Sequence, residues 1–299
     1  MRILLLGANG QVGTELQRSL APLGELVSAT RGGRLADGTA CKVADFDQPG
    51  SLSDMVERIA PDIVVNAAAY TAVDRAEEEI GAAFRANAES PRVLGQACAS
   101  CDALLVHYST DYVFDGRSSR PYREDDATSP LGVYGTSKLA GEGAIEEAGG
   151  LHLILRTGWV YASHGNNFLR TMLRLANQRD ELRVVADQRG SPTPAWLIAD
   201  VTARILSQGI TQSGVRHLVT SGETSWYGFA TAIMEQAHAS GLIASKPRVL
   251  PITTADFPTP AQRPAYSVLD TALLRHDYTL VLPEWRPALD TTLSQLSAS

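Results

Sequence analysis

The sequence predicts an α/β fold in which helices cover both faces of a doubly wound parallel sheet, with a smaller C-terminal lobe beside it. Two observations carry this prediction. Short apolar segments alternate with helical patterns through the first two thirds of the chain, as in successive βαβ units. Segments such as DIVVNAAA at 62–69 are apolar without alternation, which is typical of strands buried on both faces. At 299 residues and 44% hydrophobic content, the chain is long enough for this architecture.

The expected elements of the sheet follow in order along the chain. The strands are expected at residues 2–6, 25–30, 41–44, 62–67, 103–108 and 151–157. The helices between them are expected at residues 11–20, 51–60, 77–99 and 134–148.

After about residue 160 the pattern changes. A helix at 167–178, a strand at 182–186 and a loop at 190–194 precede a helix at 196–208 and a strand at 215–219 that return to the sheet. The remainder, including PITTADFPTPAQRPAY at 251–266, is rich in Pro and Thr and predicts loops between short helices. We therefore expect a nucleotide-binding domain at 1–162 that 195–220 rejoins, and a substrate-binding lobe at 163–194 and 221–299.

Charge and composition restrict the function. A net charge of −7 and a pI near 5.4 argue against nucleic acid as a partner. The apolar run at residues 3–6 is too short for a secretion signal, and no run approaches the ~18 apolar residues of a membrane span, so a cytoplasmic protein is expected. Cys98 and Cys101 form a Cys-x-x-Cys pair without a second pair or suitably spaced His, and we expect reduced, structural thiols.

The first strand runs into GANGQVG, which places Gly7, Gly10 and Gly13 directly before a helix. Glycines at this spacing let the backbone approach a pyrophosphate, whose charge is stabilised by free N–H groups at the helix start. Gln11 and Val12 lie in the same turn. The alternative is a tight βα turn without a ligand, but the position after the first strand of a βαβ array favours a Rossmann-type dinucleotide site.

The end of the second strand, ATRGGR at 29–34, contains no carboxylate. Thr30 and Arg31 are therefore expected near the adenosine ribose, where a basic residue accommodates a 2′-phosphate. This favours NADPH, with NADH also accepted; the alternative for Arg31 is a solvated loop residue. Asp45 and Phe46 are expected at the adenine, and residues 67–71 along the cofactor.

The segment VHYSTDYVFDG at 106–116 ends an apolar strand in polar side chains, and VYGTSKLAGE follows at 133–142. Tyr134 and Lys138 are four residues apart on a predicted helix, so both project from one face. A neighbouring ammonium favours the phenolate and makes the phenol a tunable acid. The alternative is an exposed helix pair without a catalytic role.

Together these segments resemble the extended short-chain dehydrogenase/reductase superfamily and, within it, the dTDP-4-dehydrorhamnose reductase family. The blocks that carry the closer resemblance are AAAYTAVDRAE at 67–77, HYSTDYVFDG at 107–116, SPLGVYGTSKLAGE at 129–142, RTGWVYA at 156–162, GNNFLRTMLRLA at 165–176, DQRGSPT at 187–193 and TPAQRP at 259–264. They occur in family order and span both expected lobes.

The resemblance implies roles for the polar strand end. Thr110 would hydrogen-bond the substrate carbonyl oxygen, Tyr134 would deliver a proton to it, and Lys138 would lower the pKa of the tyrosine and bind the nicotinamide ribose. Hydride would pass from NADPH to C4 of dTDP-4-dehydro-L-rhamnose, giving dTDP-L-rhamnose for cell-surface polysaccharide. Asp111 would contact the sugar or tune the acid; the alternative is a buried structural carboxylate.

The resemblance also implies binding residues. Ala69, Tyr70, Thr71 and Tyr108 would line the cofactor, together with Tyr134 and Lys138. Trp159 would pack against the sugar unless it is a core residue. Arg263, Asn167 and Phe168 would face the dTDP part, where a guanidinium suits a pyrophosphate.

Three further expectations concern metal, assembly and activity. Relatives have a Mg²⁺-linked dimer, but here Trp196 stands after GSPT where a carboxylate would be needed, so we assign no metal ligand and leave the role of Mg²⁺ open. A monomer or a homodimer is expected. Two alternative functions remain: a reductase of another 4-keto sugar nucleotide, and a cofactor-binding regulatory subunit like the methionine adenosyltransferase β subunit.

Overall fold

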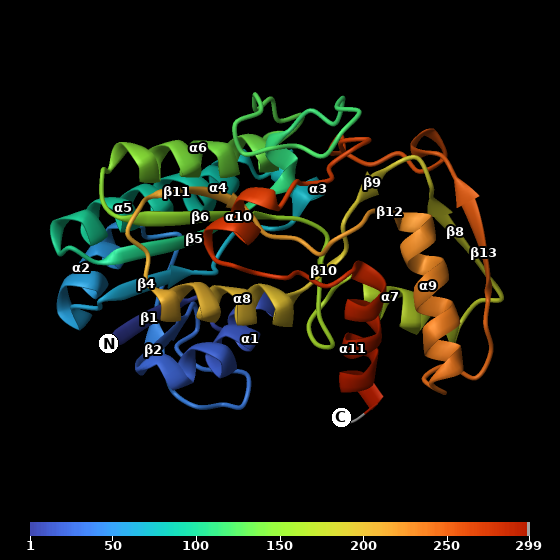
Figure 1. Ribbon diagram of the computed structural model, residues 1–299, viewed down its shortest axis with the longest axis horizontal. Coiled ribbons are helices and arrows are strands. Elements are labelled where there is room, and N and C mark those ends of the chain that lie inside the picture. The colour runs from blue at the N-terminus through green and yellow to red at the C-terminus, as the bar shows by residue number, and fades with distance from the viewer. Residues whose placement is uncertain (298–299) are drawn as a thin grey trace.

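The computed structural model describes residues 1–297, and its centre is a seven-stranded, wholly parallel sheet (Figure 1). The strand order is β11-β6-β5-β4-β1-β2-β3. The strands are β1 (Arg2–Leu6), β2 (Glu25–Thr30), β3 (Lys42–Val43), β4 (Ile63–Asn66), β5 (Leu104–Thr110), β6 (His152–Thr157) and β11 (Gly214–His217). The chain winds outward in one direction from β1 and in the other from β4. Their carboxyl ends therefore form the switch point at which open α/β sheets bind ligands.

Alternating residues of strand β1 face two separate cores. Ile3 and Leu5 belong to one hydrophobic cluster, and Leu4 and Leu6 belong to the other. Because both faces are covered, all four side chains are fully buried, which explains the uninterrupted apolar run in the sequence. Helices α1 (Gln11–Leu20) and α8 (Ala195–Gln208) cover the first face, and α2 (Gly50–Ile59), α5 (Ser90–Ser100) and α6 (Val133–Glu147) cover the second (Figure 1). The predicted fold class is confirmed.

The single helix expected at 77–99 is wrong. The structure instead has α3 (Val73–Ala76), α4 (Ile80–Phe84) and a π-helical turn, Arg85–Glu89, before α5. Pro91 explains the widened turn, because it has no N–H for the carbonyl of Asn87 and its ring would clash with that carbonyl in a regular α-helix.

The expectation of loops between short helices in the C-terminal part is confirmed for 257–271, which contains no helix, but is wrong for the segments on either side. Helix α9 (Trp226–Ala239) has 14 residues and α11 (Trp285–Ser297) has 13. Ser225 caps α9 by accepting a hydrogen bond from the N–H of Gly228. With α7 (Phe168–Ala176), these helices pack beside the parallel pair β8 (Glu181–Val185) and β13 (Arg248–Ile252), around a core of Tyr161, Phe229 and Trp285 (Figure 1).

Short elements connect these parts. They are the helical turns η1 (Ala21–Leu23), η3 (Asp111–Val113), η4 (Thr254–Asp256) and α10 (Ala272–Asp277), and the strands β7 (Val160–Tyr161), β9 (Arg189–Gly190), β10 (Thr193–Pro194) and β12 (Thr224–Ser225). The loop expected at 190–194 thus includes two short strands: β9 pairs with β12 and β10 pairs with β7.

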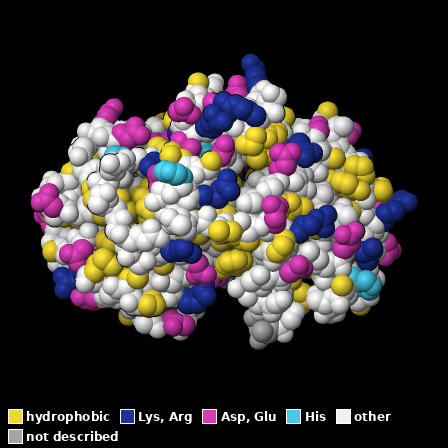
Figure 2. Space-filling view, viewed as in Figure 1, with side chains coloured by type: hydrophobic (Ala, Val, Ile, Leu, Met, Phe, Trp, Pro, Cys, Tyr) yellow, Lys and Arg dark blue, Asp and Glu magenta, His cyan; other side chains and the backbone are white. Residues whose placement is uncertain are grey.

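The surface shows no preference for one sign of charge on the face in Figure 2, where Lys and Arg are interspersed with Asp and Glu. Across residues 1–297, none of the helices is long and apolar enough to cross a membrane.

Candidate active site

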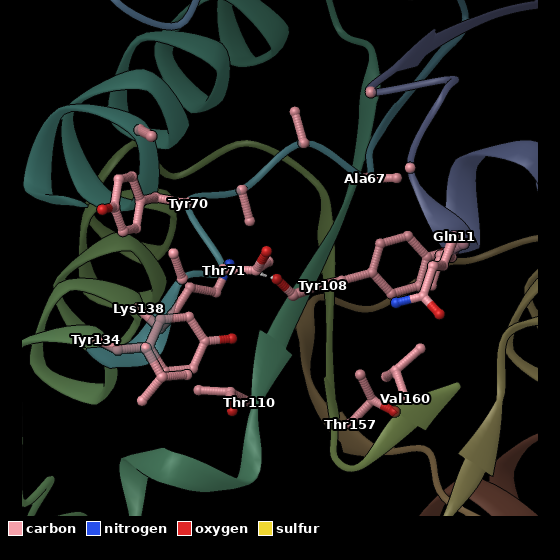
Figure 3. Close-up of a pocket in the computed structure, with 18 of the residues that line it drawn as sticks. Gln11, Ala67, Tyr70, Thr71, Tyr108, Thr110, Tyr134, Lys138, Thr157 and Val160 are labelled. Atoms are coloured by element: carbon pink, nitrogen blue, oxygen red, sulfur yellow. Dashed lines mark hydrogen bonds between the residues drawn. The ribbon is translucent and has the colours of Figure 1, made fainter. Parts of the chain in front are cut away.

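A cavity of about 990 Å³ lies at the carboxyl ends of the central strands, between the sheet and the C-terminal helices. Its walls come from the β1–α1 turn, the segment after β4, the end of β5 and the start of α6 (Figure 3). Residues near α7 and α9 complete the lining. The predicted site residues among them are Gly7, Gly10, Gln11, Val12, Arg31, Phe46, Ala69, Tyr70, Thr71, Tyr108, Thr110, Asp111, Tyr134, Lys138, Trp159, Asn167 and Phe168. One space therefore joins most of the residues that the sequence singled out.

The glycine turn at one end of this cavity is closely packed. Gly7 has a φ of +76°, and a Cβ there would lie 2.6 Å from the backbone nitrogen of Ala68. A Cβ on Gly13 would lie 2.1 Å from the carbonyl oxygen of Gly7, so α1 begins directly against the turn. A side chain at either position would push β1 and α1 apart. The N–H groups at the start of α1 would then move out of their place at the turn. Gly13 shapes the turn from behind and does not line the cavity.

At the far end, the surroundings of Arg31 differ from the expectation. No carboxylate lies on the strand end itself, but Asp45 and Asp47 from the loop after β3 both reach Arg31. The guanidinium forms a short contact with Asp47 and lies 3.6 Å from Asp45. Arg85 also approaches Asp47, at 3.7 Å. Two arginines thus share one exposed carboxylate beside Phe46, and Arg31 is itself 71% exposed.

Thr30 and Asp45 do not line the cavity; their side chains hydrogen-bond within the loops at this end. The buried Thr30 hydroxyl donates to the carbonyl oxygen of Arg34 at 3.0 Å and shapes the loop after β2. Besides its contact with Arg31, Asp45 accepts a hydrogen bond from the N–H of Asp47 at 3.0 Å.

The Tyr134 and Lys138 pair lines the cavity from α6, beside strand β5 (Figure 3). Lys138 is 2% exposed and donates to the carbonyl oxygen of Tyr108 at 2.6 Å. Burial lowers the pKa of Lys138 to about 8, against a smaller opposing effect of Glu142. Burial raises the pKa of Tyr134 to about 12, so its phenol is protonated at neutral pH, as a proton donor must be.

Thr110 and Asp111 continue the wall where β5 ends. The Thr110 hydroxyl donates to Oδ1 of Asp111 at 3.1 Å and accepts a hydrogen bond from the N–H of Tyr112. Within residues 1–297, Oδ2 of Asp111 is buried without a hydrogen-bond partner. Burial raises the pKa of this carboxyl to about 6. Since Asp111 belongs to the cavity lining, its unpaired acceptor marks a place for a polar ligand group.

The opposite side of the cavity is aromatic. Trp159 has a φ of +50°, unusual for a large side chain, and stacks on Trp226 with ring centroids 3.6 Å apart and planes 2° apart. Phe168 packs against Trp226 at 4.7 Å. Asn167 caps α7 and donates to Oε1 of Gln11 at 2.9 Å, which ties the C-terminal lobe to the first helix.

Arg263 is the predicted substrate residue that does not line the cavity. Its guanidinium pairs with Asp74 of α3, at 2.8 Å and 3.1 Å to the two carboxylate oxygens. The hydrogen bond from Arg263 is the first cause of a lowered pKa at Asp74. The same carboxylate accepts the N–H of Ala261 at 3.3 Å, so Asp74 holds the 259–264 segment beside the site.

Sequence reasoning missed several residues of this site, among them Asp47 and Trp226 in the cavity wall and His107 and Asn66 behind it. Trp226 lines the cavity, but as the first residue of an unpredicted helix it gave no signal. His107 and Asn66 lie behind Lys138 and were treated as strand residues; the polar character of two neighbouring strand ends could have indicated them.

The cysteines and acidic residues form no further centre. Cys41, Cys98 and Cys101 are free, and burial raises the pKa of the Cys98 thiol to about 12. In the described part of the chain, no three His, Cys, Asp or Glu side chains gather as a metal site would require.

Comparison with known proteins gives a consistent result over the whole chain. A family model described as the RmlD substrate binding domain matches residues 1–298. The chain is 46% identical to the dTDP-4-dehydrorhamnose reductase of Escherichia coli K12 over 299 residues, covering 99% of this chain and 98% of that protein. It is 48% identical to the dTDP-4-dehydrorhamnose reductase of Burkholderia thailandensis over 305 residues, covering 99% of each.

Solved structures agree. A dTDP-4-dehydrorhamnose reductase from Clostridium acetobutylicum is similar with a TM-score of 0.90 and 36% identity, covering 99% of this chain and 100% of that one. The dTDP-4-dehydrorhamnose reductase of Bacillus anthracis in complex with NADP has a TM-score of 0.89 and 34% identity, with 98% and 99% coverage.

Proposed function

This chain belongs to the dTDP-4-dehydrorhamnose reductase family, and we propose that it reduces the C4 keto group of dTDP-4-dehydro-L-rhamnose with NADPH to give dTDP-L-rhamnose. The observation that carries the proposal is the continuity of the cavity. A dinucleotide turn at Gly7 and a proton donor at Tyr134 line the same space of about 990 Å³. The product is the sugar nucleotide from which rhamnose enters cell-surface polysaccharide.

The residues present fit a nicotinamide dinucleotide. A Cβ on Gly7 or Gly13 would collide with the backbone, so the turn keeps the close-packed form that a pyrophosphate needs. Gly10 and Gln11 at the start of α1 would hold the pyrophosphate, and residues 67–71 would lie along the cofactor. When bound, the nicotinamide supplies the hydride that adds to C4.

Tyr134 would donate its phenolic proton to the carbonyl oxygen as negative charge develops there. Its protonated state at neutral pH suits this task. Lys138, held by the carbonyl oxygen of Tyr108, would stabilise the phenolate left behind and bind the nicotinamide ribose. Thr110 would rotate its hydroxyl from Asp111 toward the substrate oxygen, so that two donors meet the developing charge. Asp111 would then accept a hydrogen bond from a hydroxyl group of the sugar.

The sugar nucleotide would lie between the strand ends and the aromatic wall. Trp159, backed by Trp226, offers a flat apolar face to the deoxysugar. Asn167 and Phe168 would approach the dTDP part from α7. Arg263 would leave Asp74 for the diphosphate, because a dianionic group competes well for a guanidinium that is already near the site.

The coenzyme preference rests on Arg31. We propose that a 2′-phosphate takes the place of Asp47 at Arg31, with Arg85 close by, which favours NADPH. The carboxylate of Asp47 would accept a hydrogen bond from the free 2′-hydroxyl of NADH, so both coenzymes would be used.

We also propose the division into two lobes that the sequence predicted. Residues 1–162 and 195–220 would bind the nucleotide, and residues 163–194 and 221–299 would select the sugar. The joining of β11 to the sheet and the separate core around Phe229 support this division.

The test is an assay of NADPH oxidation with dTDP-4-dehydro-L-rhamnose made in place by its epimerase. Turnover by the wild type and its loss in Tyr134→Phe would support the proposal. Tight NADPH binding without turnover of any 4-keto sugar nucleotide would overturn it in favour of a regulatory subunit.

A further inference from the structure

Behind Lys138 lies a buried polar pair that the reaction described above does not use. His107 on β5 is fully buried, and Asn66, its partner in register on β4, is 1% exposed. Nε2 of His107 lies 3.2 Å from Nζ of Lys138, and Nδ1 lies 3.0 Å from Nδ2 of Asn66. The three side chains form a line from the central strand to the catalytic lysine.

The hydrogen-bond directions along this line are determined at Asn66. Its Oδ1 accepts the N–H of Ala68 at 3.1 Å, so its amide NH₂ is the group that faces the imidazole. Nδ1 of His107 must therefore accept, and the neutral ring carries its proton on Nε2. That proton points at Nζ of Lys138.

This arrangement distinguishes the two protonation states of the lysine. A neutral amine has a lone pair that accepts from Nε2–H, whereas an ammonium has three N–H donors and no acceptor. The carbonyl oxygen of Tyr108 takes one lysine N–H at 2.6 Å in either case. To accommodate the ammonium, His107 must move its proton to Nδ1, and Asn66 must turn its oxygen to the ring and release Ala68.

We propose that Asn66 and His107 form a buried two-state relay that follows the protonation of Lys138, with the ring proton on Nε2 beside the amine and on Nδ1 beside the ammonium. His107 is then a positioning residue that acts through the lysine. The relay deepens the proposed function, on which its catalytic meaning rests. Because the ammonium state leaves the N–H of Ala68 without its partner, the relay favours the amine and holds the lysine ready to lose its proton.

The other titratable groups around Lys138 do not change charge in the pH range in which the lysine titrates. Burial and then the charge of Lys138 lower the pKa of His107 well below its usual value, so the ring stays neutral. Glu142, one turn along α6, is engaged by Arg156 at 2.7 Å. On the same wall of the cavity, burial brings the pKa of Asp111 to about 6 and that of Tyr134 to about 12. Near pH 8, the lysine is therefore the group that changes charge.

Histidine-selective ¹⁵N labelling of the full chain tests the relay. Long-range ¹H–¹⁵N spectra distinguish Nδ1–H from Nε2–H, and His107→Gln identifies the signals of His107 among the six histidines. We expect Nδ1–H below the titration of Lys138 and Nε2–H above it, with a midpoint near pH 8. In Lys138→Met, the ring should keep Nε2–H at every pH. A His107 tautomer that stays the same from pH 6 to 10 in the wild type would overturn the proposal.

Asn66→Asp provides a kinetic readout. A carboxylate accepts from Ala68 N–H and from Nδ1–H at once, so the ring would present its Nε2 lone pair to an ammonium at every pH. We expect the tautomer change to disappear and the alkaline limb of kcat to move up by about one pH unit or more. The relay would be contradicted if the alkaline limb of kcat stayed at the same pH in a variant whose melting temperature and NADPH affinity are those of the wild type. The wild-type spectra need no substrate, so failure of the proposed reaction would leave them unaffected.

Discussion

The hydroxyl of Thr110 donates its hydrogen to the carboxylate of Asp111 at 3.1 Å, and the two side chains are only 4% and 2% exposed. In this state Thr110 has no hydrogen to offer a substrate carbonyl. In the proposed reaction, substrate binding would turn this hydroxyl toward the carbonyl oxygen. The buried carboxylate would then need a new donor, which a hydroxyl group of the sugar would supply.

Replacing Asp111 with Asn should stabilise the protein at alkaline pH. Burial raises the folded-state pKa of this carboxyl from 3.8 to about 6, so the wild type loses stability as the pH rises from about 4 through 6. At pH 8, the free energy of unfolding of the Asp111→Asn variant should exceed that of the wild type by on the order of 3 kcal/mol. This difference should vanish by about pH 4. Urea unfolding at both pH values measures this. A gain that is equal at pH 4 and pH 8 would contradict the burial argument.

Tyr134→Phe should retain the fold and NADPH binding but lose roughly 10² to 10⁴ in kcat, because it removes the proposed general acid. Lys138→Met should weaken NADPH binding as well as turnover, since the ammonium would contact the ribose. Fluorescence titration with NADPH and steady-state kinetics separate the two outcomes. Near-normal kcat in the Tyr134→Phe variant would assign the proton to another donor.

Arg31→Ala should lower NADPH affinity on the order of tenfold and NADH affinity little. A charge-assisted hydrogen bond to the 2′-phosphate contributes about 1.5–3 kcal/mol, and Asp47 would remain for the ribose hydroxyl of NADH. Arg34→Ala is the matched control, because Arg34 lies on the same loop but its guanidinium bonds to the carbonyl of Gly38. Equal losses for both coenzymes would show that Arg31 does not contact the phosphate.

Gly190→Ala should raise KM for the sugar nucleotide. A Cβ there would lie 2.4 Å from the indole of Trp159 and would push the ring from its stack on Trp226. Overpacking of this kind costs about 1–3 kcal/mol of stability. If about 1.4 kcal/mol of substrate binding is lost when the ring moves, KM rises roughly tenfold. Gly143→Ala on α6 is the control, since its Cβ would meet nothing within 4 Å. An unchanged KM would mean that the sugar does not use the Trp159 face.

Arg263→Ala should raise KM strongly with a smaller effect on kcat, because it removes binding present in both ground and transition states. Asp74→Asn leaves the guanidinium in place but removes its charged partner, so KM should change less. Initial rates over a range of substrate concentrations compare the two. A larger KM effect in the Asp74→Asn variant would place the diphosphate elsewhere.

The sequence predicted the parts of this site that depend on local pattern. The strand β1 and helix α1 have the bounds expected from apolar periodicity, and the glycine turn, Thr110, Tyr134 and Lys138 line one cavity. These features follow from short-range spacing and from the rule that parallel strands end together at one edge.

What could not be predicted depends on contacts between distant segments. Asp47 reaches Arg31 only because β3 lies beside β2, and Trp226 reaches Trp159 only because α9 packs on the C-terminal core. The π-helical turn before Pro91 places the carbonyl of Asn87 so close that a Cβ on Gly141 would lie 2.0 Å from it. No pattern within one segment encodes such pairs.

The most direct test of the account is the stereochemistry of the product. The enzyme is incubated with NADPH and dTDP-4-dehydro-L-rhamnose, and the sugar nucleotide formed is identified by mass and by the NMR couplings at C4. We predict dTDP-L-rhamnose, formed in equal amount to the NADPH consumed. Formation of the C4 epimer, dTDP-6-deoxy-L-talose, would keep the proposed proton donor and contradict the proposed function.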